Sequence, residues 1–225
     1  MTTQFPIQFE FQIKSFGNFY AIANIELVKQ LKQCVAIAEP RWIVLAGESG
    51  YGKSHLLQAC CQQASGIGIS AFYYPFSHQL PSVELFEGLE QFELICFDDI
   101  HHGIGAFYWE RSFLDFLNRY SGRLILSTLL SDLKLPFHSQ LLSKKLSHFK
   151  RLIFETLSTE EMVSIFIRQA YYRGLCISPQ VGHYLLKNYA FDLTGLWILL
   201  EQLDKAGLSA KHKLTIPFIK RILDN

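Results

Sequence analysis

One short segment constrains this chain more than any other. Residues 47–54 read Gly-Glu-Ser-Gly-Tyr-Gly-Lys-Ser and complete the phosphate-binding pattern G-x-x-x-x-G-K-S. An apolar run at 42–46 precedes the loop and is typical of a buried strand, whereas residues 53–64 after it are typical of a helix. The backbone N–H groups of such a loop, together with the helix N-terminus, cradle phosphates. The segment therefore predicts a nucleotide site in an α/β fold.

Each residue type in the loop has a physical role in that site. Gly47, Gly50 and Gly52 let the backbone turn tightly and approach the phosphates. Lys53 is expected to reach the β- and γ-phosphates, and the Ser54 hydroxyl is expected to hold a metal ion. The predicted cofactors are ADP or ATP and Mg²⁺.

Bulk composition limits the remaining classes. The 225 residues suffice for one ordinary domain and a smaller second one, and 49% of them are hydrophobic. A formal net charge of +1 indicates no global attraction to nucleic acid or to an anionic membrane. No apolar run approaches the roughly 20 residues that cross a bilayer, and no signal peptide is recognised. Five cysteines without zinc spacing fit the cytoplasm, and no membrane partner is expected.

Short apolar runs alternate with helical stretches through the first two thirds of the chain. This alternation predicts a parallel sheet with helices on both faces. The predicted strands are Ile43–Ala46, Ile69–Tyr74, Glu93–Phe97 and Arg123–Ser127, and Lys150–Phe154 is a candidate fifth strand.

After residue 157 the pattern becomes helical only. Ser158 with Glu161 forms a capping box that opens the first of four expected helices. We therefore expect a tail at 1–20, an α/β nucleotide-binding core at 21–157 and a small all-α lid domain at 158–225. This arrangement resembles that of AAA+ proteins.

A second motif supports the first. The apolar run at 94–97 ends in Asp98 and Asp99, and ligands of parallel sheets bind beyond the carboxyl ends of strands. Asp98 is expected near the Mg²⁺ held by Ser54, and Asp99 is expected to orient the attacking water. The alternative is a solvated acidic strand end. Ser127 and Thr128 end the next strand and either sense the γ-phosphate or merely cap the strand.

The details resemble one branch of the AAA+ proteins. The loop continues into His55-Leu56-Leu57, which is similar to the loop of the bacterial replication initiator DnaA and adds His55 to the expected nucleotide contacts. Residues 213–220 are similar to the last helix of the Hda family, the short DnaA homologues that inactivate DnaA. Residues 116–119 and 201–206 are also similar to that family.

The resemblance implies a regulatory role. Hda proteins bind the DNA-loaded sliding clamp of the DNA polymerase through an N-terminal peptide and promote hydrolysis of the ATP held by DnaA. Gln4, Ile7 and Phe9 resemble this clamp peptide, with the apolar residues in a hydrophobic pocket and Gln4 at its rim. The alternative is that residues 5–11 form an edge strand on the chain's own core. DnaA and the clamp are the expected partners, and DNA is expected to be contacted only through the clamp. The sequence is also compatible with a homo-oligomer.

Two positions depart from the family. An arginine finger in an L-x-S-R segment is replaced by Lys144, or by Lys145 if the count runs back from residue 157. Lysine keeps the charge but loses the bidentate fork, and these lysines could alternatively belong to a solvated basic face. The arginine that the family places early in the third lid helix is replaced by Phe191. Weak intrinsic ATPase activity at most is expected. The alternatives are a scaffold that binds DnaA without accelerating hydrolysis and a helicase-loader-type ATPase.

Overall fold

The computed structural model describes residues 14–76, 82–134, 137–190, 192–205 and 213–223. Five parallel strands form the main sheet in the spatial order β2-β3-β4-β1-β5. The predicted parallel sheet is thereby confirmed, and the candidate fifth strand belongs to it. The strands are β1 (Trp42–Gly47), β2 (Ala71–Pro75), β3 (Leu94–Asp98), β4 (Arg123–Leu129) and β5 (Lys150–Ile153).

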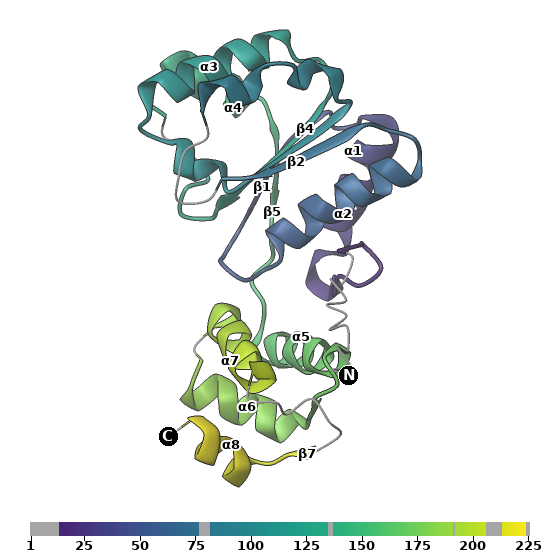
Figure 1. Cartoon of the computed structure of the whole chain (residues 1–225), viewed down its shortest axis with the longest axis vertical. Helices are drawn as coiled ribbons and strands as arrows, with labels where there is room; N and C mark the ends of the chain where they lie inside the picture. Colours follow the sequence, from purple (N-terminus) through teal and green to yellow (C-terminus); the bar gives the residue numbers. More distant parts are fainter. Residues whose placement is uncertain (1–13, 77–81, 135–136, 191, 206–212, 224–225) are drawn as a thin grey trace, which may run out of the picture.

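Helices cover both faces of this sheet (Figure 1). Successive side chains of a strand point to opposite faces, so the buried strands feed two separate cores. Leu124 and Leu126 belong to an aromatic-rich core with helices on one face, whereas Ile125 belongs to the core on the other. The first face carries α3 (Phe107–Arg119) and α4 (Gln140–Ser147), and the second carries α1 (Ile25–Ile37) and α2 (Lys53–Gly66). Short 3₁₀ helices occur at Ile22–Asn24, Val83–Phe86, Leu89–Gln91 and Ile100–Gly103.

The strand register gathers the predicted motifs at one edge. Gly47 at the end of β1 lies opposite Leu129 of β4, and Ala46 lies opposite Thr128. The last paired residues of β3 and β4 are Phe97 and Leu126, so the acids and hydroxyls follow side by side. Parallel strands therefore bring segments that are far apart in sequence to the carboxyl edge of the sheet.

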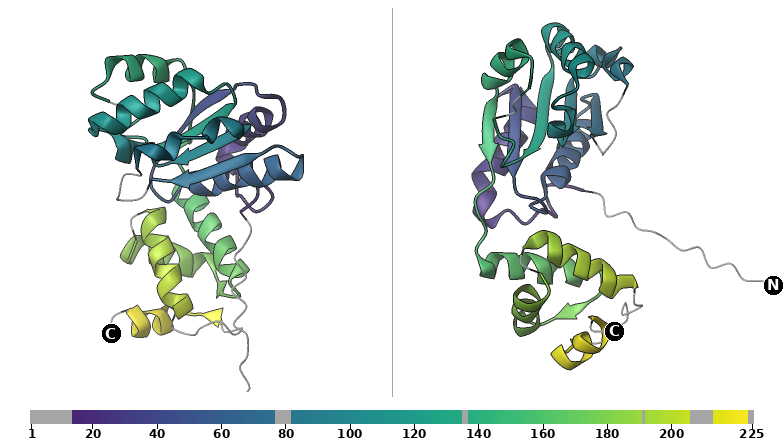
Figure 2. Two further views of the ribbon diagram at one scale, coloured as in Figure 1. Left: turned by 45° about the horizontal axis from the view of Figure 1, so that its top comes forward. Right: turned by 90° about the vertical axis from the view of Figure 1, so that its left-hand side faces the viewer.

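The lid follows as a second body at one end of the core (Figures 1 and 2). The capping box at Ser158 and Glu161 is present at the start of α5. The lid is helical as expected, except for one strand pair that the sequence did not predict: β6 (Cys176–Ile177) pairs in parallel with β7 (Lys213–Leu214). Strands of two residues are too short to show an alternating pattern in sequence. The lid helices are α5 (Thr159–Tyr172), α6 (Pro179–Asn188), α7 (Leu193–Lys205) and α8 (Ile216–Leu223).

Within the described ranges, the helices are all too short or too polar to traverse a lipid bilayer.

Candidate functional site

The phosphate loop forms a tight turn that is followed directly by α2. The N–H of Tyr51 donates to the carbonyl of Glu48 at 3.4 Å, with Gly50 at a φ of +77° inside the turn. Gly52 caps α2 with a φ of +92°, a backbone conformation that residues other than glycine rarely adopt. A Cβ at Gly52 would also lie 2.8 Å from the ring of Phe19. Both glycines are therefore required by the backbone.

Lys53 lies folded against its own loop. Its side chain is buried, and its ammonium donates to the carbonyls of Gly47 and Glu48, both at 3.0 Å. Burial lowers the pKa of Lys53, whereas the nearby Asp99, Asp98 and Glu48 raise it. The ammonium is thus held beside the loop by groups that a bound phosphate could replace.

Asp98 is buried at the end of β3 and is held by hydrogen bonds. Its carboxylate is only 3% exposed and accepts hydrogen bonds from the hydroxyls of Tyr73, at 2.8 Å, and Ser127. The Ser127 hydroxyl in turn accepts the N–H of Asp99 at 2.7 Å. The two hydroxyls thus fix the Asp98 carboxylate to β2 and β4. Thr128 is fully buried, and its hydroxyl finds no hydrogen-bond partner in the described part of the chain.

Asp99 is the acid that faces the open space. It lines a cavity of about 450 Å³ together with Ser49, Lys53 and Ser54. Its backbone is left-handed, with a φ of +56°, so the chain turns sharply at the strand end. Burial raises the pKa of Asp99, as does the charge of Asp98, while Lys53 and two histidines oppose the shift. Of the two predicted acids, Asp99 is the one that lines this cavity.

The donor set of this cavity suits Mg²⁺. The Ser54 hydroxyl and the Asp99 carboxylate both supply oxygen, which this hard cation prefers, and Mg²⁺ usually keeps waters and phosphates as its other ligands. Asp98 lies behind them and does not line the cavity. The assignment of Ser54 and Asp98 to the metal stays a prediction.

Sequence reasoning did not assign a role to His101 and His102, although both line this cavity. Their ring centroids lie 4.3 Å apart, and Nδ1 of His101 is buried without a partner among the described residues. Burial lowers the pKa of His101, which Asp99 partly offsets. Two adjacent histidines on a loop form no recognisable motif. Only the fold shows that they lie at the carboxyl edge of the sheet.

His55 faces away from this cavity. Its Nε2 lies 2.8 Å from the carbonyl of Ser15 and must donate, because a carbonyl only accepts. The ring packs on Phe19 at 5.5 Å, and burial lowers its pKa. His55 therefore helps to hold the segment before α1 against the start of α2.

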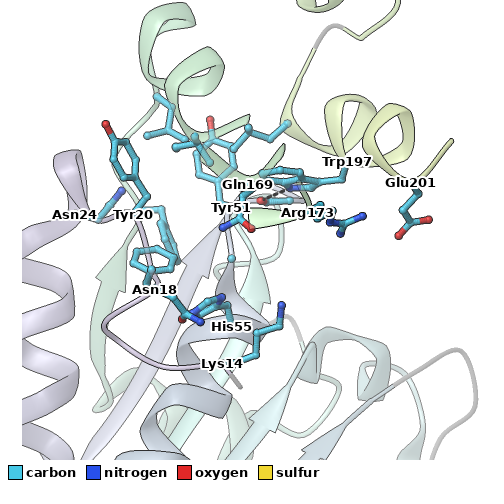
Figure 3. A pocket seen from close by; sticks show the side chains of 17 residues that line it. Lys14, Asn18, Tyr20, Asn24, Tyr51, His55, Gln169, Arg173, Trp197 and Glu201 are labelled. Atoms are coloured by element: carbon cyan, nitrogen blue, oxygen red, sulfur yellow. Dashed lines mark hydrogen bonds between the residues drawn. The ribbon is translucent and has the colours of Figure 1, made fainter. Parts of the chain in front are cut away.

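A second cavity of about 340 Å³ lies between core and lid (Figure 3). The core contributes Tyr20, Tyr51 and His55 to its wall, and the lid contributes Gln169 and Trp197. Aromatic side chains and the charged groups of Lys14, Arg173 and Glu201 line this cavity, whereas Lys53, Asp99 and two histidines line the neighbouring one. Gly50, Gly52 and Trp197 line both cavities, so the two spaces meet at the loop.

Among the described residues, a hydrogen bond and a cation–π contact are two of the contacts that join the lid to the core around this space. The indole N–H of Trp197 in α7 donates to the carbonyl of Gly50 at 2.9 Å. The guanidinium of Arg168 in α5 lies 5.2 Å from the ring centroid of Tyr20. The sequence offered no signal for either contact, because each joins residues far apart in the chain.

The two finger candidates have different surroundings. Lys144 is exposed on α4, whereas the ammonium of Lys145 donates to Asn118 at 2.8 Å and lies 5.5 Å from the ring centroid of Trp42. The start of α4 is held by Glu110, which is 1% exposed and accepts the N–H groups of Gly105, His138 and Ser139. Lys144 is thus the one of the pair that is presented to solvent.

Some predicted residues fall outside the described ranges. These are the clamp-peptide residues Gln4, Ile7 and Phe9, and the lid residue Phe191.

Comparison with known proteins gives two sequence relationships. Residues 159–223 match the family described as Hda, lid domain. Over its whole length the chain is 32% identical to an uncharacterised protein of Haemophilus influenzae, and the alignment covers 100% of both proteins.

The fold is similar to that of solved DnaA structures. Domain III of Thermotoga maritima DnaA matches with a TM-score of 0.74 and 16% identity, over 95% of this chain and 96% of that domain. The AMPPCP-bound DnaA from Aquifex aeolicus matches with a TM-score of 0.71 and 20% identity. That match covers 87% of this chain but 66% of that one, so the chain spans just under two thirds of the longer protein. The AAA+ fold prediction is confirmed.

Proposed function

The chain belongs to the Hda-like, DnaA-homologous branch of the AAA+ proteins, and from this premise we propose that it is a negative regulator of the initiation of DNA replication. It binds a nucleotide, docks on the sliding clamp and promotes hydrolysis of the ATP bound to DnaA. The observation that carries the proposal is a lid that matches the Hda family and that contacts a complete phosphate loop.

The two adjoining cavities support ADP or ATP as the ligand. A nucleotide has a base that suits a partly apolar wall and phosphates that need N–H groups and a cation. The cavity of about 340 Å³ offers aromatic and polar side chains, and the neighbouring one offers the loop and Lys53. The Aquifex aeolicus DnaA of similar fold holds AMPPCP. The base is proposed to occupy the first space and the phosphates the second.

Ser54 and Asp99 are proposed to hold Mg²⁺ when nucleotide binds, with Asp98 behind them. The ion would supply positive charge at the phosphate oxygens. Intrinsic hydrolysis is proposed to be weak at most. Phe191 brings no charge to the lid position where the family has an arginine, and the Asp98 carboxylate is already engaged by two hydroxyls.

The hydrolysis that matters is proposed to occur on DnaA. A cation offered by another chain can stabilise the charge on the transferring phosphoryl group. Lys144 suits this role because it is exposed on α4, whereas Lys145 is already engaged by Asn118. We therefore propose Lys144, rather than Lys145, as the residue offered to DnaA.

The tail is proposed to bind the clamp through Gln4, Ile7 and Phe9, so that DNA is reached only through the clamp. A pull-down with the clamp tests this step, with Gln4→Ala and Phe9→Ala as the variants. Binding by wild type that both variants retain in full would contradict the assignment. We propose a cytoplasmic location, because the nucleotide and the DNA-loaded clamp are both found there.

A non-catalytic scaffold is the second candidate, because lysine lacks the bidentate fork of arginine. Hydrolysis of labelled ATP on DnaA separates the two. The regulator predicts faster hydrolysis with wild type than with a Lys144→Ala/Lys145→Ala variant. Equal rates for the two proteins would favour the scaffold.

A further inference from the structure

We propose that Trp197 is a positioning residue that fastens the lid to the phosphate loop, so that the position of the lid and the shape of the loop backbone are coupled through one uncharged hydrogen bond. The inference rests on the proposed nucleotide function of the cavities. The loop motif contains neither Trp197 nor its coupling to the lid.

The contact joins two segments that are 147 residues apart. The indole Nε1 of Trp197 donates to the carbonyl of Gly50 at 2.9 Å, in partly buried surroundings. Figure 3 shows the indole beside Tyr51, at the junction of lid and loop. A hydrogen bond shielded from water restrains both of its partners more than an exposed one does. The tip of the loop is therefore tied to α7.

This bond orients the backbone of the loop. A trans peptide unit is planar, so the Gly50 carbonyl and the Tyr51 N–H point in opposite directions. When Trp197 holds the carbonyl, the N–H is directed to Glu48, where it closes the turn. On the core side, Lys53 holds the carbonyls of Gly47 and Glu48. The loop is thus restrained from the core by Lys53 and from the lid by Trp197.

Packing at the same point leaves little freedom. A Cβ at Gly50 would lie 3.0 Å from both the backbone nitrogen and the hydroxyl oxygen of Thr194, in the first turn of α7. Tyr51 packs against the core on the α2 face of the sheet and also against the core of the lid. The lid helix therefore lies directly on the loop, and Trp197 supplies the directional bond within that contact.

The position of Trp197 connects this contact to the ligand. Trp197, Gly50 and Gly52 are the residues shared by the two cavities. A ligand with its base in one cavity and its phosphates in the other passes this junction. Loss of the indole donor should therefore loosen the lid and weaken nucleotide binding together.

The chain offers a matched control. Trp42 at the start of β1 also donates its indole N–H to a backbone carbonyl, that of Gly122, at 2.9 Å. The loop lies at the other end of the same strand. Trp197→Phe and Trp42→Phe thus remove the same kind of bond, near to and far from the site.

The first readout is the equilibrium binding of a fluorescent ADP analogue to the full chain. Trp197→Phe should weaken binding about tenfold, the equivalent of about one hydrogen bond. Trp42→Phe should stay within about twofold of wild type. Unfolding midpoints are measured for all proteins, and Trp197→Leu serves as the second variant if Trp197→Phe does not fold.

The second readout is amide hydrogen exchange in nucleotide-free protein. Trp197→Phe should speed exchange in residues 48–52 and at the start of α7, with the strands of the sheet unchanged. If both Trp197 variants exchange their amide hydrogens and bind the ADP analogue as wild type does, the inference is overturned. If wild type binds no nucleotide and the exchange difference persists, the proposed nucleotide function fails while the fastening role of Trp197 stands.

Discussion

The hydroxyl of Tyr73 on β2 donates to Oδ2 of Asp98 at the end of β3, at 2.8 Å. Ser127 of β4 donates to the other carboxylate oxygen, so Asp98 connects three neighbouring strands. Gln58 of α2 donates to the Tyr73 hydroxyl at 3.2 Å and extends the network to the helix after the phosphate loop. An acid expected to serve the ligand therefore also organises the edge of the sheet.

Tyr73→Phe should destabilise the fold by about 1–3 kcal/mol, because a buried carboxylate loses a hydrogen-bond donor. Urea unfolding at pH 7 measures the change. Tyr74→Phe is the matched control in the same strand, since the described residues offer its hydroxyl no hydrogen bond, and it should cost less than about 0.5 kcal/mol. Equal costs for the two variants would show that the Tyr73–Asp98 bond contributes nothing specific.

Glu110→Gln should destabilise the chain by about 1.5–3 kcal/mol near neutral pH. Burial opposes ionisation of Glu110, but the N–H groups of Ser139, Gly105 and His138 outweigh it and hold its pKa below the ordinary 4.5. A lowered folded pKa means that the unfolded chain binds the proton more readily. The stabilisation is therefore fully present above about pH 4.5 and is lost as pH falls through the folded pKa.

Urea unfolding at several pH values checks this dependence. The difference between wild type and Glu110→Gln should shrink as pH falls below 4.5. Asp115→Asn on the exposed side of α3 should change stability by less than about 0.5 kcal/mol. A gap between wild type and Glu110→Gln that is constant with pH would contradict the assigned role of the carboxylate.

Lys144→Ala should leave stability within about 0.5 kcal/mol of wild type while it reduces the stimulation of ATP hydrolysis on DnaA. Lys145→Ala should instead lower stability more than it lowers the stimulation of ATP hydrolysis. It loses the bond to Asn118 and the contact with Trp42, at a cost of about 0.5–1 kcal/mol. Parallel unfolding and hydrolysis measurements compare the two, and a loss of stimulation confined to Lys145→Ala would reverse the assignment.

Gly52→Ala should destabilise the chain by about 1–3 kcal/mol and abolish nucleotide binding. Its φ of +92° is unfavourable for alanine, and the new Cβ would meet Phe19 at 2.8 Å. Gly66→Ala at the other end of α2 is the control, because a Cβ there meets nothing within 4 Å and φ is not positive. That control should be neutral or slightly stabilising in thermal unfolding. Similar losses in both would contradict the conformational argument.

The features that could be predicted from the sequence were those with a local pattern. Apolar runs gave the five strands of the main sheet, and Ser158 with Glu161 gave the start of α5. The phosphate loop gave Lys53 and Ser54, which line one cavity with Asp99. The pairing of β6 with β7 was missed because such short strands carry no period.

The remaining features depend on contacts between distant segments. Tyr73 is one of several aromatic residues in β2, and nothing local shows that its hydroxyl meets Asp98. Trp197 lies in a lid helix and belongs to no motif, yet its indole reaches Gly50. Lys144 and Lys145 cannot be distinguished in the sequence. Only the packing of α4 on α3 shows that Lys144 is exposed and that Lys145 bonds Asn118.

We propose that this chain acts on ATP held by another protein. The most direct measurement loads DnaA with labelled ATP and follows its conversion to ADP in a single turnover, with and without clamp-loaded DNA. Addition of wild-type protein should accelerate conversion when clamp-loaded DNA is present. An unchanged rate, from protein that binds both nucleotide and the clamp, would contradict the claim.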